Sequence, residues 1–263
     1  MKSRTAVALL LLVLAAGCGR GHGDGALAGA GSEAEHGYLR PPELKGVAAA
    51  GAAGSTLTGL GSPGAEIRLD STRGEVILSK ADASGDWSVP LPPAASARLF
   101  NLSMTDEGRV VQAQGYLLLL PDGKAARLRA GGGTELLNGA ADTVRVETLD
   151  YDGEFGAIVA GRAHAGETVS LRVDGVQRAR AVADASGRYA AALNFPLSRG
   201  AHDFDVAATG EEAHLPLPIS TPAALGGARF SALATTFGWR VDWLTPGGGE
   251  QTTLIIETSE PRR

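Results

Sequence analysis

The pentapeptide ADASG occurs twice, as ADASGDW at residues 81–87 and as ADASGRY at residues 183–189. An aspartate at the first position of a type I turn accepts hydrogen bonds from later backbone amides, and a glycine at the fourth position supplies a left-handed backbone. A turn of this kind commonly joins two strands of a hairpin. We therefore predict a structural turn in both copies, formed by Asp82, Gly85, Asp184 and Gly187.

The two copies also agree in the residues just after the turn. Trp87 and Tyr189 stand two places after the glycine, and strand side chains alternate, so both aromatic rings should return to the core face. A catalytic interpretation of the pentapeptide would need partners that recur with it, and no histidine, cysteine or second acid does so. The repeated pentapeptide is predicted to be a turn, with no catalytic residue in it.

The repetition extends beyond the pentapeptide. The stretch TGLGSPGAEIRL at residues 58–69 aligns with AGRAHAGETVSL at residues 160–171, and the offset of 102 residues (184 − 82) is the same in both segments. Short runs rich in β-branched and apolar residues alternate with Gly, Pro, Asp and Ser, which is typical of strands in a sandwich or barrel. These features predict an all-β chain with one module at residues 41–138 and a second at residues 139–258.

The modules resemble a known group of β-sandwiches. The pattern Pro63-Gly64-Ala65-x-Ile67-x-Leu69, followed by the first aspartate turn, is similar to bacterial Ig-like and carboxypeptidase-regulatory-like domains. The second copy repeats most of this pattern and adds Pro196-Leu197-x-x-Gly200-x-His202, which looks like the entry to a closing strand of bacterial Ig-like repeats. The resemblance implies two tandem Ig-like sandwiches of the Greek-key type. It implies no catalytic residues, because such domains mostly space, present or dock other molecules.

The N-terminus has the pattern of an export signal. Lys2 and Arg4 precede an uninterrupted apolar run over residues 6–16, which ends in small residues. A charged start and an apolar run of about 11 residues are typical of a secretory signal and are too short for a membrane span. We expect residues 1–17 to be removed on export.

The end of the signal, LAAGC at residues 14–18, resembles the lipobox of bacterial lipoproteins. The resemblance implies cleavage before Cys18 and acylation of this residue, and Gly19 after it implies transfer to the outer membrane. Cys18 is the single cysteine of the chain, so no disulfide can form. Several acyl chains on one residue would anchor the protein firmly, because a single chain binds membranes only marginally.

The segment after the cysteine is rich in glycine and cannot bury enough apolar surface to fold. We interpret residues 18–40 as a flexible tether. Without residues 1–17, 22 basic residues (24 − 2) stand against 29 acids, so the net charge is near −7. A mildly acidic chain without a basic stripe is a poor candidate for binding nucleic acid.

The C-terminal region holds the best candidate for a contact surface. The stretch FGWRVDW at residues 237–243 alternates strictly, which would place Phe237, Trp239, Val241 and Trp243 on one strand face. A turn containing Gly247, Gly248 and Gly249 follows, and residues 252–257 return as a second strand. The two tryptophans could fill a core, contact a partner protein or stack on a glycan, and the sequence leaves these alternatives open.

Acidic residues and histidines are the side chains of this sequence that could hold a metal ion. Glu147, Asp150, Asp152 and Glu154 gather between the modules, where they form either a solvated acidic linker or a calcium site. The histidines of the modules stand at no metal-ligand spacing. We expect no metal and no cofactor. The sequence thus predicts a non-enzymatic envelope lipoprotein that binds a partner protein, with carbohydrate binding through the tryptophan hairpin as the alternative.

Overall fold

The computed structural model describes residues 38–49, 54–138, 143–154, 156–257 and 260–262. The signal peptide, Cys18 and the tether up to residue 37 lie outside the described residues. Leu39–Arg263 forms one compact unit. In the described part of the chain, no helix has the length and hydropathy that a membrane span requires. The regular structure consists of strands, which confirms the predicted all-β class.

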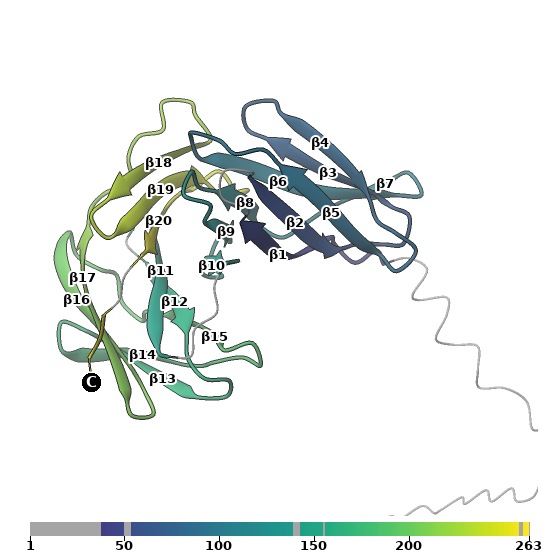
Figure 1. The fold of residues 1–263 in the computed structure, drawn as a ribbon. Coiled ribbons are helices and arrows are strands. Elements are labelled where there is room, and N and C mark those ends of the chain that lie inside the picture. The colour runs from purple at the N-terminus through teal and green to yellow at the C-terminus, as the bar shows by residue number, and fades with distance from the viewer. Residues whose placement is uncertain (1–37, 50–53, 139–142, 155, 258–259, 263) are drawn as a thin grey trace, which may run out of the picture. The chain divides into compact units, whose positions relative to one another are not determined.

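Residues 43–136 form two sheets that are antiparallel throughout (Figure 1). Sheet 1 has the order β1-β2-β5, and sheet 2 has the order β10-β9-β8-β6-β3-β4, with β7 pairing β6 at one side. The strands are β1 (Glu43–Ala49), β2 (Ser55–Leu60), β3 (Glu66–Ser71), β4 (Val76–Lys80), β5 (Asp86–Leu91), β6 (Arg98–Asp106), β7 (Arg109–Gln112), β8 (Tyr116–Leu119), β9 (Ala125–Leu128) and β10 (Glu135–Leu136).

Residues 145–262 form two more antiparallel sheets, which Figure 1 draws in colours from teal through green to yellow. Sheet 3 has the order β15-β12-β11-β20-β19-β18, and sheet 4 has the order β14-β13-β16-β17-β21. The strands are β11 (Arg145–Asp152), β12 (Ala157–Arg162), β13 (Thr168–Val173), β14 (Val176–Val182), β15 (Arg188–Ala192), β16 (Gly200–Ala208), β17 (Glu211–Ile219), β18 (Phe230–Thr235), β19 (Gly238–Leu244), β20 (Glu250–Ile256) and β21 (Glu260–Arg262).

The sequence repeat is a repeat of strand pairing. β1, β2, β3, β5, β6 and β7 each begin 102 residues before β11, β12, β13, β15, β16 and β17 (for β1 and β11, 145 − 43 = 102). The pairings correspond as well, since β2 joins β1 to β5 as β12 joins β11 to β15. Even a β-bulge recurs, between Leu44 and Gly46 in the first copy and between Val146 and Thr148 in the second.

Each ADASG segment is a turn with the expected hydrogen bonds. Oδ1 of Asp82 accepts from the amides of Ser84 (2.7 Å) and Asp86 (3.0 Å). Oδ1 of Asp184 accepts from the equivalent amides at 2.8 and 3.0 Å. Gly85 and Gly187 have φ values of 86° and 75°, a conformation that favours glycine. The pentapeptide therefore returns because the same hairpin corner is built twice.

A glycine opposite an aromatic ring explains a second repeated pair. Gly59 pairs with Trp87 across β2 and β5, and Gly161 pairs with Tyr189 across β12 and β15. A Cβ atom on Gly59 would lie 2.2 Å from the Trp87 ring and 2.1 Å from the carbonyl oxygen of Glu43. The ring occupies the space that a side chain would need, so the glycine is required by packing.

This packing predicts that Gly59→Ala destabilises the fold. The added methyl group meets backbone and ring atoms that cannot move without disturbing two strands, and overpacking of this kind costs about 1–3 kcal/mol. Urea unfolding followed by tryptophan fluorescence would measure the loss. Gly46→Ala is the matched control, because a Cβ there lies 3.6 Å from the Thr58 hydroxyl, an ordinary contact. Equal stability of the two variants would contradict the packing argument.

Candidate functional site

Three apolar clusters alternate with the four sheets. One cluster fills the space between sheets 1 and 2, and another fills the space between sheets 3 and 4. The third, which we call the joint cluster, joins sheet 2 to sheet 3. Its buried residues are Ala97, Leu99, Leu118, Leu120, Ala126, Leu128 and Leu136 from the first sandwich and Val241, Trp243 and Ile255 from the second. The two sandwiches thus share one apolar interior.

β8 and β20 contribute to both a sandwich interior and the joint cluster, because both faces of each strand are buried. In β8, Leu117 and Leu119 point into the first sandwich while Leu118 points into the joint cluster. In β20, Leu254 and Ile256 point into the second sandwich while Ile255 points into the joint. A continuous apolar run is the sequence signal of such a strand. The runs YLLLL at residues 116–120 and LII at residues 254–256 carry that signal.

The tryptophan hairpin forms part of this joint. Trp243 has no exposed surface. Its indole N–H donates to the Thr253 hydroxyl (3.0 Å), and its ring meets that of Tyr116 edge-on, with centroids 5.8 Å apart. The predicted partner or glycan surface is therefore wrong for Trp243, which cannot stack on an external ligand. The core alternative holds, and that core lies between the sandwiches.

The other residues of the predicted contact surface lie in different environments. Trp239 is partly buried against the joint cluster, and its indole N–H donates to Asp122 of the first sandwich (2.9 Å). Phe237 lies in the turn before β19 and packs on the interior of the second sandwich, so it does not share the tryptophan face as predicted. Gly247, Gly248 and Gly249 form the predicted turn between β19 and β20 and are exposed.

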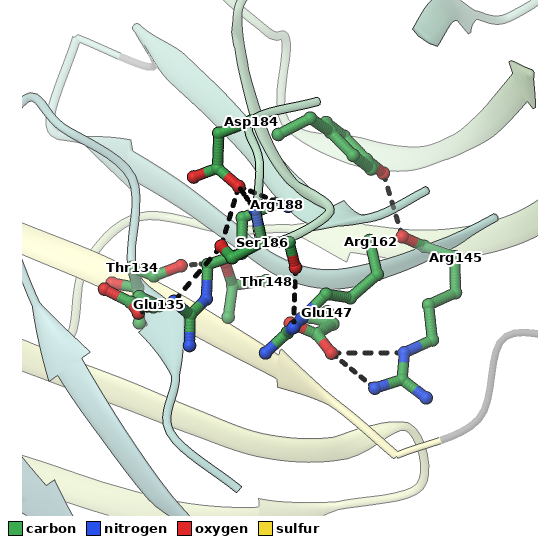
Figure 2. A network of polar contacts seen from close by, with 10 residues as sticks. Thr134, Glu135, Arg145, Glu147, Thr148, Arg162, Asp184, Ser186 and Arg188 are labelled. Atoms are coloured by element: carbon green, nitrogen blue, oxygen red, sulfur yellow. Dashed lines mark hydrogen bonds and ion pairs between the residues drawn. The ribbon is translucent and has the colours of Figure 1, made fainter. Parts of the chain in front are cut away.

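A buried carboxylate fastens the segment that connects the sandwiches. Asp150 on β11 accepts hydrogen bonds from the backbone amide and the hydroxyl of Thr134 and from the hydroxyl of Thr253. The Thr148 hydroxyl donates to the Thr134 carbonyl (2.9 Å), a contact drawn in Figure 2. Burial raises the pKa of Asp150, and the threonine hydrogen bonds offset only part of that effect. The sequence did not indicate a role for Thr134 or Thr253, because neither residue stands in a recognisable motif.

Ion pairs surround this fastening (Figure 2). Glu135 of β10 pairs with Arg188 of β15 at 2.8 Å, and it also approaches Arg127 at 3.7 Å. Glu147 pairs with Arg145 at 2.5 Å and with Arg162 at 3.4 Å. A pocket of about 170 Å³ opens among these groups. The Glu135–Arg188 pair crosses between the sandwiches, so charge as well as apolar contact holds them together.

The four acids predicted to lie between the modules divide into a buried pair and an exposed pair. Glu147 and Asp150 are buried in β11, and Asp152 accepts the amides of Glu154 and Gly156 in a hairpin turn. The expectation of a solvated linker is therefore wrong for the two buried acids. The Glu147 carboxylate forms ion pairs with arginines, and the Asp150 carboxylate accepts hydrogen bonds from threonines. Among the described residues, no group of three acids, histidines or cysteines is placed to hold a metal ion.

His202 has the structural role that its position at the start of a strand suggested. Its Nδ1 lies 2.7 Å from Asp174, and its Nε2 lies 2.9 Å from the Ser198 carbonyl oxygen. Burial alone would lower the pKa of His202, but the hydrogen bonds with Asp174 and Ser198 outweigh it and raise the pKa. The pair fastens the turn between β13 and β14 to β16.

The comparisons with known proteins add little to what the strand pairing shows. No protein-family model matches the sequence, and neither does any curated protein sequence. InvD of Yersinia pseudotuberculosis is a solved structure that is similar over 84% of this chain and 81% of its own, with 14% identity and a TM-score of 0.21. A likeness of this size carries no argument, and the sandwich assignment rests on the strand pairing described above.

The joint cluster predicts that both sandwiches unfold together. Leu118→Lys places a charge in an apolar space with no partner, which should cost several kcal/mol and uncouple the sandwiches. Differential scanning calorimetry should show one transition for the wild type and two for the variant. Leu233→Lys, at a leucine that is 63% exposed on β18, is the control and should keep one transition. Two transitions in the wild type would contradict a shared interior.

The raised pKa of Asp150 predicts a pH-dependent stability difference. The fold favours the protonated acid, so this group stabilises most below its unfolded pKa of about 3.9, and the contribution is lost as the pH rises through the folded pKa. Asp150→Asn keeps an oxygen that accepts from Thr134 and removes the buried charge. Its stability relative to wild type should therefore rise with pH, by about 1.4 kcal/mol for each pH unit between the two pKa values.

Chemical denaturation at a series of pH values measures this difference. Asp86→Asn, at an exposed carboxylate on β5, is the control for a general effect of losing one negative charge. A stability difference for Asp150→Asn that stays flat from pH 4 to 7, or that falls as the pH rises, would show that the fold does not favour the protonated acid.

Proposed function

We propose that this chain is a non-catalytic envelope lipoprotein in which two fused β-sandwiches form a rigid scaffold for a protein partner. The observation that carries the proposal is the joint cluster, because its apolar residues from both sandwiches are buried together. Domains within one chain move relative to each other by default, unless a large hydrophobic interface holds them. A shared interior would keep the two sandwiches in a fixed arrangement, as a scaffold protein requires.

The polar residues of the joint support the same proposal. Asp150 is enclosed by threonines, Glu135 is paired with Arg188, and Glu147 is paired with Arg145 and Arg162. Each of these carboxylates holds one strand or segment against another. Asp242, the other acid that is buried among the described residues, likewise pairs with Arg240 and accepts from the Thr252 hydroxyl. This use of the charged groups favours a structural role over a chemical one.

Glycan binding through the tryptophan hairpin is not part of the proposal. Stacking on a sugar needs an exposed indole face, and Trp243 is enclosed between the sandwiches. Trp239 alone is partly accessible, and its N–H is held by Asp122.

The anchor in this proposal is Cys18, which lies outside the described residues. Its support is the lipobox-like LAAGC and the export signal before it. Acyl chains on Cys18 would attach the chain to a bilayer, and the glycine-rich residues 19–37 would give the folded unit a reach on the order of 25 Å from the surface. The partner would then be another protein of the envelope.

This proposal predicts that Cys18→Ser releases the protein from the membrane. Without the thiol no acyl chain can be attached, so the protein should move from the membrane fraction to the soluble fraction and lose palmitate labelling. The wild type should accumulate as a precursor in cells treated with globomycin. Fractionation, radiolabelling and immunoblotting measure these effects.

Gly19→Asp serves as the matched variant, because an acid after the cysteine opposes transfer to the outer membrane in the lipoproteins that this segment resembles. It should keep its label and its membrane attachment while moving to the inner membrane. A Cys18→Ser protein that remains in the membrane fraction would rule out the lipid anchor.

A further inference from the structure

The strand at the outer edge of sheet 3 is chemically unlike the other sheet edges. β18 pairs only with β19 (Figure 1), so one side of its backbone faces no strand among the described residues. Proteins usually protect such edges with charges or prolines. Among the described edge strands, β18 alone has neither a charged residue nor a proline. The charged residues and prolines of the other edge strands are Glu43 and Lys45 (β1), Asp86 and Pro90 (β5), Lys80 (β4), Arg109 (β7), Glu135 (β10), Arg188 (β15), Arg178 and Arg180 (β14), and Glu260, Pro261 and Arg262 (β21).

The direction of the free backbone groups follows from the pairing. The amide of Leu244 donates to the carbonyl of Arg229, and the hydrogen-bonded positions of an antiparallel pair alternate along the strand. Arg229, Ser231 and Leu233 therefore direct their backbone groups toward β19. The N–H and C=O groups of Phe230, Ala232 and Ala234 point the other way. They are available to an added strand.

A groove lies beside these groups. It has a volume of about 430 Å³ and is lined by consecutive residues, 227–232, on one side. The first sandwich supplies the other side through Thr72, Arg73, Ser96 and Ala97. Because both sandwiches contribute to its walls, the groove depends on the joint cluster that holds them together.

The groove is positively charged in a protein that is acidic as a whole. Arg73 and Arg229 both line it, and no carboxylate does. Both arginines are exposed, and neither forms an ion pair with a described residue. The Arg73 guanidinium donates to the Ser96 hydroxyl (2.7 Å), which holds it at the wall of the groove. The net charge of the whole chain is −5, so this charge is local.

We propose that the groove binds an extended acidic segment of a partner protein, which adds to β18 as a further antiparallel or parallel strand. Strand addition draws its affinity from main-chain hydrogen bonds and its specificity from side-chain contacts along the edge. The outward backbone groups of β18 would form the main-chain hydrogen bonds. The two arginines would provide the specificity, because they favour carboxylate side chains. This inference rests on the proposed scaffold function and names the chemistry of the partner.

A second copy of this chain is the less suitable occupant. The sequence FSALAT of β18 carries no acid, and Arg229 directly precedes it. If β18 paired with β18 of a second copy, neither Arg73 nor Arg229 would meet a carboxylate on the added strand. Charge complementarity thus favours a foreign acidic strand.

The test uses the purified full-length mature protein and a fluorescein-labelled peptide of alternating valine and glutamate. Fluorescence anisotropy should show binding, and the same peptide with lysine in place of glutamate should bind at least about tenfold more weakly. The double variant Arg73→Glu/Arg229→Glu should lose about tenfold in affinity for the glutamate peptide. Arg180→Glu, at an exposed arginine on the distant edge strand β14, is the matched control and should bind as the wild type does.

A second variant tests strand addition itself. Ala232→Pro removes an outward N–H without breaking a hydrogen bond to β19, so it should abolish peptide binding while circular dichroism stays unchanged. Hydrogen exchange provides the direct readout, since the amides of Phe230, Ala232 and Ala234 should become protected when the glutamate peptide binds.

Three results would overturn the proposal: no binding of the glutamate peptide, equal binding of the lysine peptide, or protection that omits these three amides. Self-association of the protein that Ala232→Pro removes would assign the edge to a second copy instead. None of these results depends on the lipid anchor, so a failure here is distinguishable from a failure of Cys18→Ser.

Discussion

The contact between the outer faces of sheets 2 and 3 is the constraint on which the arrangement of residues 39–263 depends. In an isolated sandwich these faces would meet water. Here Leu99, Leu118 and Leu128 of the first sandwich pack against Val241 and Trp243 of the second. Burying such side chains stabilises by about 1.5–3 kcal/mol each. The contact also explains why these residues form one compact unit even though none of the described strands pairs with a strand of the other sandwich.

The joint shows how a duplicated framework acquires different surfaces. The repeated bulge contains Lys45 in the first copy, where it is exposed, and Glu147 in the second, where it is buried between Arg145 and Arg162. The backbone is the same in both places. The side chains differ because only the second bulge lies on a sheet that is covered on both faces. Pairing is thus inherited from the repeat, whereas burial is set by what covers each copy.

Apolar contact and polar contact have different roles in the joint. The apolar residues supply area, but they would tolerate a small displacement of one sheet over the other. The hydrogen bonds of Asp150 with Thr134 and Thr253 and the Glu135–Arg188 pair require particular partners. Polar contacts of this kind add little net stability, and we infer that they select one arrangement of the two sheets. In the proposed scaffold, that arrangement also forms the groove beside β18, whose two walls come from different sandwiches.

The sequence by itself determined the all-β class, the two hairpin corners at Asp82 and Asp184, and the offset of 102 residues, because turns and alternation are local and a repeat is visible as letters. It also indicated that residues 237–243 are a strand. Only the tertiary structure decided what that strand faces, since an alternating aromatic strand looks the same whether its neighbour is water, a ligand or another sheet. The partners of Asp150 come from positions 16 and 103 residues away, and no local pattern encodes such a separation. The groove beside β18 is likewise assembled from segments far apart in the chain, so its charge could not be seen before the sandwiches were placed together.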